Sequence, residues 1–173
     1  MNLQLRKIEP SDLPFLYQWE NDATMWADSD THNPLSRHDL HQYIENTTGD
    51  IYRDGQLRLI IEDSQLSTLN SQLSTKIVGC IDLFDFDARN RKSAIGMYIA
   101  PDARGRGVGK QAVQLLLDYA FNFLHLRMVY AIISVNNVAC SRLYEQMDFL
   151  PSSSLRAWTL EGDAILWQKM NTN

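Results

Sequence analysis

The sequence predicts one α/β domain, in the broad sense that includes α+β folds. Its 173 residues are enough for one domain and hardly for two. The composition is ordinary for a globular protein, with 45% hydrophobic and 21% charged residues. Strand-like segments dominate the first half, a β-α-β-α-β-β order follows, and no linker divides them. We therefore expect a single domain over residues 1–173.

Strands are predicted from alternation and from β-branched and aromatic content. Residues 3–8 alternate apolar and polar side chains, as a half-buried strand does. Residues 128–135 form a near-continuous apolar run, which is typical of a strand covered on both faces. The other strand-like segments are 56–62, 76–86, 93–99, 149–158 and 163–170.

Two helices are predicted near the N-terminus. The Pro-Ser-Asp triplet at 10–12 opens an amphipathic helix that ends at about Asn21. Ser36, with Asp39 three residues later, resembles a capping box for a helix that ends at about Asn46. Leu13 and Leu16 of the first helix are expected to face inward, and Trp19 is a further candidate.

Two more helices are predicted in the second half. One begins at Val108 and ends at about Leu124 with a strong apolar period. A shorter helix begins after Asn136-Asn137 and ends at about Met147. The apolar face of the longer helix is expected to hold Val108, Ala112, Leu115, Leu116, Tyr119 and Phe123.

One internal repeat lies between two predicted strands. Residues 64–68 (SQLST) recur at 71–75, seven residues later. Two copies dominated by Ser and Thr cannot build a coiled coil. We interpret them as a short duplication that lengthened a β-hairpin loop, since surface loops tolerate insertions.

Charge and cysteine content limit the classes of partner. Lys and Arg total 16 and Asp and Glu total 21, which gives a formal charge of −5. Such a chain is a poor candidate for nucleic-acid binding and suits a cationic partner better. Two cysteines, Cys80 and Cys140, form no disulfide framework. With no 18-residue apolar run and no secretory leader, we expect a cytoplasmic protein that makes no use of a membrane.

The strongest motif is the segment 104–110, RGRGVGK, between a strand and a helix. Its alternating glycines let the backbone approach a ligand closely. The start of the helix supplies unpaired N–H groups and the positive end of a dipole. With the cations Arg104, Arg106 and Lys110, the segment predicts an anion cradle, most often one for phosphate.

Two familiar phosphate motifs are excluded at this segment. A P-loop needs a Gly where Arg104 stands and a Ser or Thr where Gln111 stands. A dinucleotide fingerprint that starts at Gly105 needs a Gly at position 110, which is Lys110. A nucleotide-binding switch is therefore disfavoured.

The pattern that fits is Arg-x-x-Gly-x-Gly, carried by Arg104, Gly107 and Gly109. It resembles the pyrophosphate signature of the GNAT superfamily of acetyl-CoA-dependent N-acetyltransferases. The stretch 93–121 resembles the superfamily's strand, loop and helix, and 134–149 resembles its next segment. The opening 5–22 is similar to the branch that contains ribosomal-protein N-terminal and spermidine acetyltransferases. The resemblance implies a mixed, mostly antiparallel sheet of about six to seven strands flanked by about four helices.

Two positions depart from the family's pattern. Asp148 stands where a Gly usually precedes the Phe, and Cys140 replaces a small Ala. Asp can adopt the left-handed conformation that Gly takes more easily. Neither change removes a catalytic group.

The resemblance also implies the cosubstrate and its contacts. Acetyl-CoA is expected with its pyrophosphate on Gly105, Val108 and the rest of the segment 104–110, and no metal is expected. Backbone groups of Met97 and Ile99 are expected to bind pantetheine as an added strand would. Asn137 and Tyr144, seven residues apart, share a helix face about 10 Å apart along the axis. Asn137 then fits the pantetheine amide.

The catalytic residues are expected from the same resemblance. Tyr144 occupies the position of the family's general acid, which protonates the leaving thiolate. Asp82 aligns with a carboxylate near the amine site of spermidine acetyltransferases, so it is the candidate base. Between Ile81 and Leu83, Asp82 is expected on the opposite sheet face from both.

Acidic and aromatic residues suggest where an amine would enter. Glu20, Asp22, Asp28 and Asp30 would attract a polyamine or a basic peptide. Trp19 and Trp26 either cover such a substrate or belong to the core. Cys140 is not expected to be a nucleophile. His38 and His41, without a third ligand, are not expected to bind metal.

The sequence therefore predicts an acetyl-CoA-dependent N-acetyltransferase that acts by direct attack in a ternary complex. A polyamine or similar small cationic amine is the favoured acceptor. A protein N-terminal amine and an aminoglycoside stay open. So does a non-catalytic acyl-CoA-binding protein. Such enzymes are often dimers, which leaves a homodimer open as well.

Overall fold

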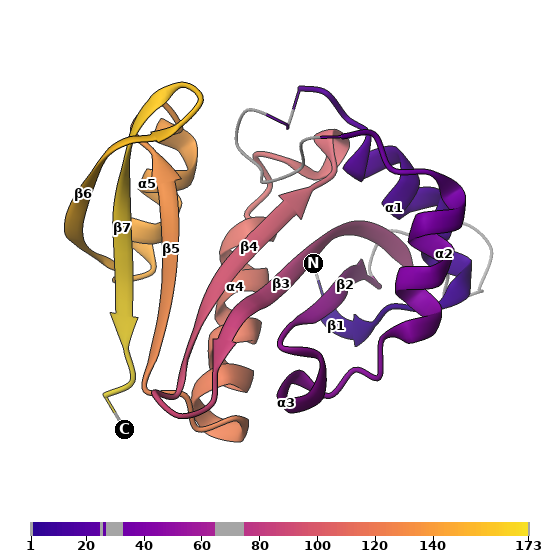
Figure 1. Cartoon of the computed structure of the whole chain (residues 1–173), viewed down its shortest axis with the longest axis horizontal. Helices are drawn as coiled ribbons and strands as arrows, with labels where there is room; N and C mark the ends of the chain where they lie inside the picture. The colour runs from indigo at the N-terminus through magenta and orange to yellow at the C-terminus, as the bar shows by residue number, and fades with distance from the viewer. Residues whose placement is uncertain (1, 25, 27–32, 65–74, 173) are drawn as a thin grey trace. The chain divides into compact units, whose positions relative to one another are not determined.

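The computed structural model describes residues 2–24, 26, 33–64 and 75–172 (Figure 1). Its backbone divides into two compact units. The first unit holds Met1–Ile8, Gly49–Val129 and Met170–Asn173. The second unit holds Glu9–Thr48 and Tyr130–Lys169. The expectation of a single domain over residues 1–173 stays a prediction.

The first unit contains four consecutive antiparallel strands, visible in Figure 1. In β3, Ile81 and Leu83 are fully buried and Asp82 between them is half-buried. Asp63 pairs with Lys76, so β2 and β3 form an antiparallel pair, and residues 65–74 of the repeat lie outside the described part. The strands, in spatial order, are β1 (Leu3–Lys7), β2 (Leu57–Asp63), β3 (Lys76–Asp87) and β4 (Lys92–Ile99).

The main helix of the first unit is α4 (Val108–Asp118), which packs against β1, β3 and β4. On the predicted apolar face, Val108, Ala112 and Leu116 are buried, and Leu115 and Tyr119 are half-buried. The prediction was wrong for Phe123, whose side chain is 70% exposed. The cause is a π-helical turn, η4 (Tyr119–Phe123), which replaces the expected α-helical end and breaks the 3.6-residue period. Short helices at Ile51–Asp54 (α3) and Pro101–Ala103 (η3) were not predicted.

The second unit opens with the two predicted N-terminal helices. A short η1 (Pro10–Asp12) leads into α1 (Leu13–Glu20), in which Leu16 and Trp19 are buried. The capping box of α2 (Arg37–Asn46) is confirmed. The Asp39 N–H donates to Ser36 Oγ at 3.1 Å, and the Ser36 N–H donates to Asp39 Oδ2 at 3.0 Å.

The rest of the second unit has three neighbouring strands in the order β5-β7-β6. Helix α5 (Val138–Gln146) follows β5 in the chain. Figure 1 shows β6 and β7 as a hairpin, and their pairing is antiparallel. The strands are β5 (Met128–Ser134), β6 (Leu150–Thr159) and β7 (Gly162–Met170).

The described residues thus form seven strands and five α-helices, which confirms the predicted fold class. The α-helix that was not predicted is α3, whose four residues are too few to show an apolar period. None of the helices in the described ranges has the length and apolar character needed to cross a membrane.

Candidate functional site

The glycine segment lies in the first unit, where it follows η3 and leads into α4. Gly105 and Gly107 have φ angles of +71° and +81°, and Gly107 is the N-cap residue of α4. A Cβ atom built at either position would meet no other heavy atom within 4 Å. The backbone is therefore bare on that side, and a ligand can approach it closely.

The charges and dipoles of this segment suit an anion. The first helical hydrogen bond runs from the Gln111 N–H to the Gly107 carbonyl, at 3.2 Å. The N–H groups of residues 108–110 consequently have no helical partner. Buried Val108 fixes the start of the helix, while Arg106 and Lys110 are exposed beside it. The segment therefore fits the pyrophosphate of acetyl-CoA.

Arg104 is held beside the end of β4. Its Nε donates to the Ile99 carbonyl at 2.9 Å, and its guanidinium lies 5.7 Å from the centre of the Tyr98 ring. Lys76 forms an ion pair with Asp102 in η3. The Arg104–Ile99 hydrogen bond thus holds the glycine segment at the end of β4, and the Lys76–Asp102 ion pair holds η3 at the start of β3. The Ile99 carbonyl retains a second lone pair for a further donor. Half-buried Met97 lies opposite Ile81 on β3.

Asn137 and Tyr144 lie on α5 in the second unit. Asn137 is the N-cap residue, because its Oδ1 accepts the Cys140 N–H at 3.0 Å. Tyr144 is 2% exposed. Burial, together with the neighbouring Cys140 thiol, raises the pKa of its phenol. The phenol therefore carries its proton at neutral pH, as a general acid must.

The end of α5 fixes the position of Tyr144. Asp148 has a φ of +58°, the left-handed conformation that the family's usual Gly takes. This lets the Phe149 N–H donate to the Tyr144 carbonyl and the Asp148 N–H to the Glu145 carbonyl, both at 3.0 Å. The Phe149 and Tyr144 rings meet edge to face, 4.7 Å between centres. These are the bonds and the apolar contact of a Schellman motif.

Asp82 is paired, which the sequence did not indicate. Arg58 lies directly opposite it on β2, and its Nη2 donates to Asp82 Oδ2 at 2.7 Å. Arg58 Nε lies 3.0 Å from both carboxylate oxygens. The two side chains are 22% and 18% exposed. Only the strand register brings these residues together, so sequence patterns gave no signal for Arg58.

Comparison with known proteins adds the family to this geometry. The model of the acetyltransferase (GNAT) domain matches residues 2–150. The chain belongs to the GNAT acetyltransferase family. The predicted family and enzyme class, an acetyl-CoA-dependent N-acetyltransferase, are thereby confirmed.

Relatives of this GNAT chain include spermidine N(1)-acetyltransferases. That of Vibrio cholerae is 25% identical over 156 residues, which is 88% of this chain and 82% of the relative. That of Escherichia coli is 22% identical over 151 residues, which is 86% of this chain and 73% of the relative. An uncharacterized N-acetyltransferase from the SPbeta prophage of Bacillus subtilis is 26% identical over 157 residues, 90% of this chain and 80% of the relative.

A solved structure gives the same fold. Spermidine N-acetyltransferase from Vibrio cholerae, crystallised with CoA and spermine, superposes with a TM-score of 0.84. It is 22% identical, and the match covers 98% of this chain and 96% of that one. This likeness confirms the GNAT fold.

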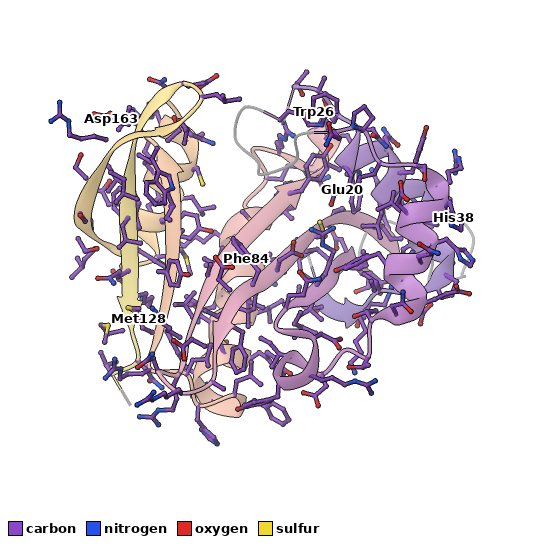
Figure 2. All side chains as sticks on the ribbon, viewed as in Figure 1. Glu20, Trp26, His38, Phe84, Met128 and Asp163 are labelled. Carbon is purple, nitrogen blue, oxygen red and sulfur yellow. The ribbon has the colours of Figure 1, made fainter. Side chains whose placement is uncertain are left out.

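The acidic and aromatic residues of this GNAT chain fall into different roles. Trp19 is buried against Phe15, which assigns it to the core. Trp26 is half-buried and donates from Nε1 to the Glu20 carbonyl at 3.0 Å; both residues are labelled in Figure 2. Asp22 accepts the Thr24 N–H at 3.0 Å and so closes a turn. Asp28 and Asp30 lie outside the described residues.

The described residues form no cluster of three or more potential metal ligands. His38, labelled in Figure 2, and His41 are exposed on α2. His41 Nδ1 lies 3.2 Å from a Glu45 carboxylate oxygen. Cys140 is half-buried next to Tyr144, and Cys80 is buried in β3.

Proposed function

We propose that this chain transfers the acetyl group of acetyl-CoA to a primary amine of a polyamine or a similar small cationic amine. Family membership supports the reaction, and relatives named as spermidine acetyltransferases over 88% and 86% of the chain support the acceptor. The observation that best supports acetyl-CoA as the cosubstrate is the bare backbone at Gly105 and Gly107.

In this proposal the segment 104–110 binds the pyrophosphate of acetyl-CoA through its N–H groups and cations. Met97 and Ile99 offer backbone groups to pantetheine. Asn137 uses Oδ1 in its helix cap, so its Nδ2 is the group that would donate to a pantetheine carbonyl. Bound acetyl-CoA supplies the activated acyl carbon, which the protein's residues position and keep from water.

The acceptor amine must lose a proton before it attacks. With a pKa of about 10.4, only roughly 0.04% of a primary amine is neutral at pH 7. The new N–C bond forms as the C–S bond breaks, and the proton on the Tyr144 hydroxyl passes to the leaving sulfur. The raised pKa of Tyr144 keeps that proton in place until negative charge has developed on sulfur.

Asp82 is the proposed base, and its pairing with Arg58 shapes this role. In this proposal Asp82 accepts a proton from the amine as the amine attacks. Arg58 would act as a positioning residue, since its guanidinium holds both carboxylate oxygens.

The test is CoA release by the purified chain with spermidine, spermine, an aminoglycoside and a peptide with a basic N-terminus. Turnover with polyamines at the highest kcat/KM is the expected result. Turnover with peptide alone, or with aminoglycoside alone, would refute the polyamine assignment. Tight acetyl-CoA binding without turnover on the whole panel would instead identify an acyl-CoA-binding protein.

A further inference from the structure

The first unit contains an apolar groove that acetyl transfer does not use. Its volume is about 430 Å³, within the range of small-molecule sites. It lies between the β1–β2 edge of the sheet and the side of α4 that packs on β1. The side chains that face it share one sheet face or one helix side: Leu3, Leu5, Lys7, Leu57, Leu59, Leu115 and Tyr119.

The groove is not closed by its own leucines. Leu5 and Leu115 are only half-buried, although their neighbours Leu3, Leu57 and Leu59 are buried. An aliphatic ligand that covered Leu5 and Leu115 would remove their apolar surface from water. That burial is the main source of affinity in such a site.

The helix that lines the groove ends in a π turn, η4. A regular α-helix would place Phe123 on the same face as Leu116 and Tyr119. Instead η4 turns the Phe123 ring outward, where it stacks on Tyr119 with 5.2 Å between ring centres and an 18° tilt. π turns in α-helices are often found at functional sites.

Two donors line the groove, Lys7 and Tyr119. The Lys7 ammonium reaches over Gly49, because a Cβ built on Gly49 would lie 2.6 Å from Lys7 Nζ. Lys7 makes no ion pair with any residue in the described ranges. The Tyr119 hydroxyl lies near Asp50 and Tyr52, and burial and these neighbours raise its pKa. Asp50 already accepts the Tyr52 N–H at 3.0 Å as the cap of α3.

We infer that this groove binds an amphiphile with an aliphatic body and one anionic head, such as a medium-chain carboxylate. The leucines contact the aliphatic chain, and the Lys7 ammonium and Tyr119 hydroxyl donate to the carboxylate. A charge-assisted bond to Lys7 sets the sign of the head group. Arg6 also lines the groove, but its Nε is paired with Glu62 Oε1 at 2.6 Å. The inference is independent of the proposed acceptor.

The test is a titration of the full chain with octanoate, followed by leucine methyl chemical shifts. Octylammonium and octanol serve as comparison ligands with the same chain. Saturable binding of octanoate, tighter than that of both comparison ligands, is expected. Lys7→Gln should weaken the binding of octanoate by about tenfold and leave the binding of octanol unchanged. Equal or tighter binding of octylammonium would overturn the inference.

Leu5→Trp tests the location by filling the groove, and Leu160→Trp is its matched control because Leu160 is 92% exposed on the second unit. Octanoate binding should be lost in the first variant and kept in the second. Unchanged binding in Leu5→Trp would overturn the inference. The inference would also be overturned if the protein were a dimer that Leu5→Trp dissociates, because a second copy would then occupy the groove. Lys7→Gln keeps the test decisive even if Leu5→Trp fails to fold.

Discussion

Replacing Gly107 with Ala separates the cost of folding from the cost of binding. A non-glycine residue at a φ of +81° costs about 1–2 kcal/mol. No steric clash adds to this, since the new Cβ would meet nothing within 4 Å. At about 2–4 °C per kcal/mol for a chain of this size, the melting temperature should fall by roughly 2–8 °C. The variant should therefore still fold.

Acetyl-CoA affinity should fall as well, for a reason separate from the backbone strain. The methyl group would occupy the space through which the pyrophosphate reaches the N–H groups of α4. Loss of one hydrogen bond to a charged group corresponds to about 1.5–3 kcal/mol, or roughly 10- to 150-fold in Kd. Isothermal titration calorimetry with acetyl-CoA measures this directly, and the bulkier Gly107→Val should abolish binding.

Gly55→Ala is a matched control for backbone strain. Gly55 has a φ of +71°, and its Cβ would likewise meet nothing within 4 Å, but it follows α3 and lies outside the glycine segment. It should lower the melting temperature as much as Gly107→Ala and leave acetyl-CoA affinity unchanged. Wild-type affinity in Gly107→Ala, or an equal loss in both variants, would refute the cradle assignment.

Four further predictions follow from the described contacts. Asp148→Gly should raise the melting temperature relative to Asp148→Ala by about 2–4 °C, because only Gly relieves roughly 1 kcal/mol of left-handed strain; equal melting curves would contradict this. Tyr144→Phe should lower kcat with little change in acetyl-CoA affinity, and any loss of wild-type kcat through Tyr144 ionisation should appear only above about pH 10, since burial raises its pKa; unchanged turnover removes Tyr144 as the acid. Arg58→Gln should lower kcat more than it lowers acetyl-CoA affinity, because the guanidinium that holds both carboxylate oxygens of Asp82 is lost; an unchanged kcat would exclude the positioning role of Arg58. Ser36→Ala should cost about 1 kcal/mol of unfolding free energy in denaturant melts, unless the α2 cap contributes nothing.

Sequence reasoning succeeded where one or two turns of chain decide the structure. The capping box at Ser36 and the left-handed Asp148 each depend on residues within about five positions. The same reasoning failed at Phe123. Its period is correct for an α-helix, but the end of α4 adopts a π turn, and no local pattern in 119–123 announces it. The sequence left two roles open for Trp19, a cover over the substrate or a place in the core, and only its burial in the structure decided between them.

By itself, the sequence predicted the family, which is confirmed, and an anion cradle, which stays a prediction. Glycines, cations and a helix start within seven residues specify backbone freedom and charge without any distant partner. Only the tertiary structure decided that Arg58 holds Asp82, and that β1 and α4 leave a groove between them. Both depend on residues separated by 24 positions or far more along the chain. Strand register and helix packing set such contacts through the sum of many burial energies, which no short stretch of sequence contains.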